Sequence, residues 1–81
     1  MPVPTTDFAL RGDHITLDAL LKATGLASSG GEAKVVINEG RVQVNGEAET
    51  RRGRKLRAGD MVALGDAQVH LRAPAPGTAG Q

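Results

Sequence analysis

The residues best suited to chemistry are basic and lie together in the segment RRGRKLR. No acid interrupts this stretch. Half of the chain's ten lysines and arginines fall in it, namely Arg51, Arg52, Arg54, Lys55 and Arg57. A guanidinium presents a planar set of donors that matches phosphate oxygens, and a cluster of cations releases counterions from a polyanion. The alternative is a charged edge strand that only prevents aggregation, which needs one or two charges rather than five. The segment is therefore predicted to bind an anion.

A second group of polar residues has helical spacing. Lys34, Asn38 and Arg41 recur at i, i+4 and i+7, so they form a stripe beside the buried face of a predicted helix. Gly30 and Gly31 at the start of that helix would let a phosphate approach its positive end. The alternative is an ordinary polar face that serves solubility. We predict that the stripe follows a phosphate backbone.

Asn45 is a candidate of a different kind, because Asn45-Gly46 is a strong signal for a two-residue hairpin turn. The turn alone accounts for both residues, although the amide of Asn45 is also able to reach ribose or phosphate. Lys22 and Arg11 stand apart from the other cations and are interpreted as solvated.

The sequence predicts no catalytic, metal or cofactor site. His14 and His70 lie far apart, with no acid at a spacing that would complete a metal site. Ser28 and Ser29 suit a loop and a helix cap, and no base pairs with them as in a nucleophilic site. The SSGGE run lacks the Gly-Lys-Ser/Thr ending of a phosphate-binding loop. The chain is therefore not expected to be an enzyme.

Composition bounds the class of protein. The 81 residues suffice for one domain, the net charge is +1, and there is no cysteine. No apolar run approaches the roughly 18 residues that span a bilayer, and the first residues do not resemble a signal peptide. We expect a cytoplasmic protein without membrane contact. We also expect a monomer, because the sequence has no additional apolar stripe that would have to be covered by a partner subunit.

Two short helices are predicted between residues 16 and 40. In the first, Thr16 is the expected cap, Gly25 the expected left-handed exit, and the apolar face is Leu17, Leu20 and Leu21. The second begins with a Ser-x-x-Glu capping box and ends at Gly40; its residues are Ser29 and Glu32 for the box and Ala33, Val36 and Ile37 for the apolar face.

The remaining elements are predicted strands. Val42 and Val44 alternate with polar residues before the Asn45-Gly46 turn, and an exposed return strand is expected over 47–50. Leu56 is expected to hold the basic segment on the core. Further strands are expected over 8–10, 61–64 and 69–71. The fold class is α+β, with two short packed helices on a small antiparallel sheet. Residues 1–6 are expected to be loose, 7–73 to form the single domain, and 74–81 to be disordered.

From Ile15 to Leu64 the chain resembles the RNA-binding domain named after the fourth protein of the small ribosomal subunit, the alpha-L motif. The landmarks are ITLDALLKATGLA, then S-x-x-E-A-K-x-x-I-x-x-G-R-V-x-V-N-G, a basic stretch, and L-x-x-G-D-x-V. It is most similar to small stand-alone bacterial members of the YbcJ type. The resemblance implies that the two helices and the hairpin form one surface for folded RNA, often ribosomal.

The chain departs from the family pattern at two positions. Many members carry arginine at the start of the first helix and just after the capping serine, whereas this chain has Thr16 and Gly30. We therefore expect phosphate contacts to shift to the RRGRK segment and Lys34.

The predicted partner is structured RNA, either ribosomal RNA or tRNA, recognised by shape and phosphate contacts. Phe8 is the only aromatic residue and is expected in the core, so a platform for stacking single-stranded bases is not expected. Reading DNA in the major groove would need more base-reading side chains on the second helix. The alternative is a small protein adaptor that docks its basic patch on an acidic partner. A third possibility is an enzyme fragment whose catalytic domain is on another chain.

Overall fold

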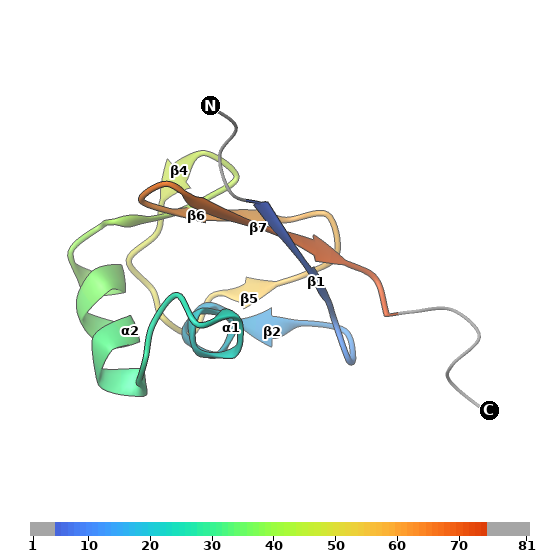
Figure 1. The fold of residues 1–81 in the computed structure, drawn as a ribbon, viewed down its shortest axis with the longest axis horizontal. Helices are drawn as coiled ribbons and strands as arrows, with labels where there is room; N and C mark the ends of the chain where they lie inside the picture. The colour runs from blue at the N-terminus through green and yellow to red at the C-terminus, as the bar shows by residue number, and fades with distance from the viewer. Residues whose placement is uncertain (1–4, 75–81) are drawn as a thin grey trace.

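Two helices pack on one side of a five-stranded sheet in the computed structural model, which describes residues 5–74 (Figure 1). The sheet has the strand order β1-β7-β6-β3-β4, and β2 and β5 form a separate two-stranded ribbon. The elements are β1 (Thr5–Ala9), β2 (Ile15–Thr16), α1 (Leu17–Thr24), α2 (Gly30–Asn38), β3 (Val42–Val44), β4 (Glu47–Ala48), β5 (Lys55–Leu56), β6 (Met61–Leu64) and β7 (Ala67–Arg72). The predicted α+β class and both helices are confirmed.

The start of α1 has the predicted capping residue but no hydrogen bond from the helix backbone to its side chain. Thr16 is the capping residue, but its hydroxyl donates to the Asp18 carboxylate at 2.7 Å instead of accepting from the helix backbone. The backbone N–H groups of Leu17 and Asp18 donate to the carbonyls of Arg54 and Arg52, at 2.9 and 3.1 Å. The first turn of α1 is thus completed by the basic segment.

The start of α2 has the predicted capping serine. The Ser29 hydroxyl accepts a hydrogen bond from the Glu32 N–H at 3.1 Å. The return bond is displaced by one residue, because the Glu32 carboxylate accepts from the N–H and hydroxyl of Ser28 at 2.6 and 2.9 Å. These two bonds lower the pKa of Glu32 from its ordinary value. The capping box therefore includes the residue before the cap.

One core joins the helices to both sheets. Leu56 of β5 is fully buried in it, as predicted for the residue that holds the basic segment. Val36 is only partly buried, and Val35 is 53% exposed. The buried apolar residues are Leu10, Leu17, Leu20, Leu21, Ala27, Ala33, Ile37, Val42, Val44, Leu56, Val62, Val69 and Leu71.

The predicted hairpin turn is confirmed. Asn45 and Gly46 have φ values of 53° and 89°, the positive angles that a type I′ turn requires at both positions. The return strand β4 is shorter than expected, with two residues, and the chain turns inward after it. Glu49 is consequently buried, 7% exposed, although this stretch was expected to be exposed.

The main sheet is mixed, whereas a small antiparallel sheet was expected. β1 pairs in parallel with β7, with Phe8 opposite Leu71, whereas the other pairings in the sheet are antiparallel. β1 begins at Thr5, so it includes Thr5 and Thr6, two of the residues expected to be loose. Residues 1–4 and 75–81, on which the other expectations of disorder fall, lie outside the described residues.

We predict that Leu56→Ala destabilises the domain by about 2–5 kcal/mol, because it leaves a cavity between the ribbon and the helices. Urea unfolding measures the change. Val35→Ala is the matched control, since it shortens an exposed aliphatic side chain and should stay within about 0.5 kcal/mol of wild type. Equal unfolding midpoints for the two variants would contradict the anchoring role.

Candidate nucleic-acid interface

The basic segment, residues 51–57, is anchored at two places. In its first half, the carbonyls of Arg52 and Arg54 accept hydrogen bonds from backbone N–H groups at the start of α1. Its second half forms β5, which pairs antiparallel with β2, so that Lys55 lies opposite Thr16 and Leu56 opposite Ile15. Because the backbone is held and Leu56 is buried, the polar side chains must face outward.

Four of the five predicted cations meet around one hollow of about 560 Å³, which we call the basic hollow; its lining is Arg51, Gly53, Arg54, Lys55 and Arg57. The fifth, Arg52, is exposed but does not line it. The fold thus concentrates the charge of the segment on one surface.

Glu49 organises this surface, and sequence reasoning missed it. Its carboxylate accepts hydrogen bonds from Nε and Nη2 of Arg51 at 3.1 and 3.3 Å, and from Nη1 of Arg54 at 2.7 Å. The Arg51 backbone N–H adds a bond of 3.0 Å. The Arg51 side-chain bonds, then those from Arg54 and the Arg51 backbone, lower the pKa of Glu49 from 4.5 to about 2. Glu49 is therefore ionised at neutral pH.

Glu49 divides the cations into two classes. Arg51 and Arg54 are held in place by the shared carboxylate, although the Arg51 side chain is still 75% exposed and that of Arg54 34%. The side chains of Arg52, Lys55 and Arg57 form no ion pair within residues 5–74. One acid among five cations leaves a strong positive excess.

The predicted stripe on α2 is exposed but separate from the basic hollow. Lys34 and Asn38 are exposed on α2, and Arg41 follows the helix and forms an exposed ion pair with Glu39 at 3.5 Å. None of the three predicted residues lines the basic hollow. The structure therefore shows two polar surfaces on different elements.

Gly30 and Gly31 open α2 without any steric need for glycine. A Cβ at Gly31 would meet only the Ser29 hydroxyl at 3.8 Å, and one at Gly30 would meet Cδ and Nζ of Lys22 at 4.0 Å. These are ordinary contacts. Lys22, interpreted from the sequence as an isolated solvated charge, is exposed and extends from α1 to the start of α2. Its ammonium lies beside one position where the family often has arginine.

The side-chain amide of Asn45 forms hydrogen bonds within the domain. Its Nδ2 donates to the Asp60 carboxylate at 3.1 Å, and its Oδ1 accepts from the Met61 N–H at 3.0 Å. These bonds tie the hairpin turn to the turn before β6, so the side chain has a structural role.

The described residues form neither a metal site nor a membrane-spanning helix. Between residues 5 and 74, no three His, Cys, Asp or Glu side chains gather closely enough to hold a metal ion. In the same range, no helix is long and apolar enough to cross a bilayer.

Residues 8–72 match the S4 domain family, so the chain belongs to that family. YbcJ of Escherichia coli (strain K12) is 42% identical over 58 residues, which cover 72% of this chain and 83% of YbcJ. RlbA of Bacillus subtilis (strain 168), named a probable ribosome maturation protein, is 48% identical over 52 residues, covering 64% of this chain and 73% of RlbA. The predicted family resemblance is confirmed.

The fold agrees with a solved relative. The solution structure of E. coli YbcJ matches with a TM-score of 0.64 and 36% identity, covering 90% of this chain and 91% of that one. That structure is described as revealing an alfaL motif involved in RNA binding. The alpha-L fold expected from the sequence is thus confirmed.

We predict that the Glu49 contacts make stability depend on acid pH. A carboxylate whose pKa is lower in the folded than in the unfolded state stabilises the fold fully at pH values above its unfolded pKa. This contribution is lost as the pH falls through the folded pKa. For Glu49 the loss should run from about pH 4.5 toward about 2. Urea midpoints from pH 6 to 2.5 should therefore fall less steeply for Glu49→Gln than for wild type.

Glu47→Gln is the matched control for this titration. Glu47 is exposed on the same hairpin and forms no ion pair with a described residue, so its variant should keep the wild-type pH dependence. Parallel curves for Glu49→Gln and wild type would show that the two arginines do not stabilise the carboxylate.

Proposed function

We propose that this S4 domain is a non-catalytic module that binds structured RNA through its phosphate backbone. The observation that carries the proposal is the basic hollow, where cations held by Glu49 and cations without an ion pair among the described residues line one surface of an anchored segment. The description of YbcJ as containing a motif involved in RNA binding supports it. The name of RlbA favours ribosomal RNA over tRNA as the partner.

The two classes of cation have different tasks in this proposal. Arg51 and Arg54 are oriented by Glu49 before RNA arrives, so little side-chain freedom is lost when their remaining N–H groups meet phosphate oxygens. Arg52, Lys55 and Arg57 supply charge and displace counterions. Orientation and charge thus come from neighbouring residues of one segment.

Shape recognition of A-form RNA fits this surface better than base reading does. The basic hollow has no aromatic residue in its lining, and its donors are charged groups suited to phosphate. A-form RNA also offers 2′-hydroxyls in a wide, shallow minor groove. Folded RNA is therefore the proposed ligand, in preference to duplex DNA.

We further propose that the domain acts as a monomer in the cytoplasm. Among residues 5–74, Val35 is the only large hydrophobic side chain that is strongly exposed, so no broad apolar face in this range requires a partner subunit.

We predict that Arg52→Ala/Lys55→Ala/Arg57→Ala weakens binding to a labelled ribosomal RNA hairpin and flattens its salt dependence. Loss of three phosphate contacts should reduce the slope of log K against log salt by about 2 to 3. Titrations over a salt series measure this slope. Wild type should bind a DNA duplex of equal length more weakly than the hairpin.

Arg72→Ala is the control, because it removes an exposed cation that is paired with Asp7 on the β1–β7 edge of the sheet. It should keep the wild-type slope. If the triple variant, shown to be folded, binds like wild type, the basic hollow is not the RNA site. Binding to an acidic protein without any RNA affinity would favour the adaptor function instead.

The α2 stripe is tested separately. Lys34→Ala/Arg41→Ala should reduce the salt slope by about 1 to 2 if the stripe follows a phosphate backbone. Glu47→Gln controls for an exposed change of charge elsewhere. An unchanged slope for the double variant would confine phosphate contacts to the basic segment.

A further inference from the structure

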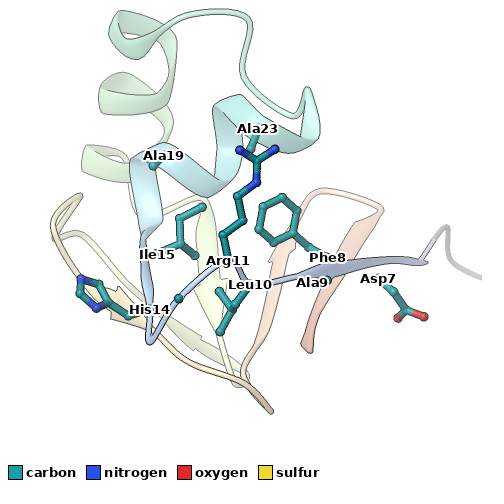
Figure 2. A pocket seen from close by; sticks show the side chains of 10 residues that line it. Asp7, Phe8, Ala9, Leu10, Arg11, His14, Ile15, Ala19 and Ala23 are labelled. Carbon is teal, nitrogen blue, oxygen red and sulfur yellow. The ribbon is translucent and has the colours of Figure 1, made fainter. Parts of the chain in front are cut away.

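A second hollow, of about 680 Å³, lies between β1, the loop after it and α1 (Figure 2). Its apolar lining includes Phe8 and Ile15, together with Ala19 and Ala23 of α1. The Arg11 side chain rises between Ile15 and Phe8, with its guanidinium near Ala23 (Figure 2). We call this the aromatic hollow.

The sequence predicted that Phe8 lies in the core, but the structure does not enclose it there. It is half-buried, packing against the core while also lining the aromatic hollow. The pairing of β1 with β7 places its backbone opposite Leu71, which is itself buried. The ring is therefore supported from behind and presented to the hollow at the same time.

Arg11 has no acid to neutralise it within the described chain. It is exposed and forms no ion pair with any residue from 5 to 74. Asp7, the acid in the lining, points away from the hollow in Figure 2, and is paired with Arg72 at 3.4 Å and near His70 at 3.9 Å. The hollow is thus lined by an aromatic ring and by a guanidinium that forms no ion pair among the described residues.

The aromatic hollow and the basic hollow both border the β2–β5 ribbon. Ile15 lines the aromatic hollow and lies opposite Leu56 across the β2–β5 ribbon. The next pair of the ribbon joins Thr16 to Lys55, which lines the basic hollow. Neighbouring strands are only about 4.8 Å apart. Because successive residues of a strand point to opposite faces, Ile15 and Lys55 lie on opposite faces of this narrow ribbon, and an RNA strand that reaches both hollows passes around the edge of the ribbon.

We propose that the aromatic hollow takes one unpaired nucleobase of the bound RNA, stacked between the Phe8 ring and the Arg11 guanidinium. RNA-binding proteins commonly stack splayed bases on aromatic rings and on arginine planes. The alanine faces of α1 limit how far the base enters. This inference rests on the proposed RNA binding and adds a preference for RNA with a bulge or loop next to a helix.

The test compares two RNA hairpins that differ only by a single bulged 2-aminopurine in the stem. Wild type should bind the bulged hairpin about tenfold more tightly, the size of one base–aromatic stack, and should quench the fluorescence of the bulged base. Phe8→Leu keeps an apolar side chain of similar size but should lose most of the preference and the quenching. Binding to the fully paired hairpin should change little.

Arg11 provides a second variant at an exposed position where folding is not at risk. Arg11→Lys keeps the charge but removes the planar group, so it should reduce the preference for the bulge while keeping the salt slope on paired RNA. If wild type binds both hairpins equally and with the same salt dependence, the base site is wrong and the proposed function stands. The base site is also wrong if Phe8→Leu, shown to be folded, keeps the preference. If neither hairpin is bound, both proposals fail.

Discussion

The backbone of the basic segment completes the first turn of α1, and much of the remaining structure depends on this contact. A helix start has N–H groups without partners, and here the carbonyls of Arg52 and Arg54 accept two of them. The same backbone continues into β5, whose Leu56 is buried under the helices. The cations consequently lie on a segment whose movement would break the hydrogen bonds at the start of α1 and expose Leu56 to solvent.

Crowding five cations into seven residues has an electrostatic cost, and Glu49 reduces it. Its carboxylate is held by two guanidinium groups, which compensates for removing the acid from water. A single acid does not neutralise the cluster, so attraction for a polyanion is retained. Because Arg51 and Arg54 are fixed by this contact, the surface differs from a set of flexible cations in a loop.

Local features of the fold were predictable, whereas contacts between distant residues were not. The capping serine, the Gly25 exit and the Asn45-Gly46 turn follow from the chemistry of a few adjacent residues, and each is found. The parallel β1–β7 pair joins opposite ends of the chain, and the mostly exposed, polar β1 gives little periodic signal. The burial of Glu49 is an exception, because its partners Arg51 and Arg54 are only two and five residues away, but the irregular turn after β4 that brings them together has no helical or strand periodicity to reveal it.

The two departures from the family pattern acquire a physical explanation from the same contacts. At Thr16, the hydroxyl bonds to Asp18, while the neighbouring strand brings Lys55 opposite it. At Gly30, the ammonium of Lys22 already lies beside the position of a side chain. In both places a cation from another element stands next to the residue that lacks one. A cation is therefore present beside each of these positions although the residue there is uncharged, and attraction to a phosphate depends on where the charge lies rather than on which residue carries it.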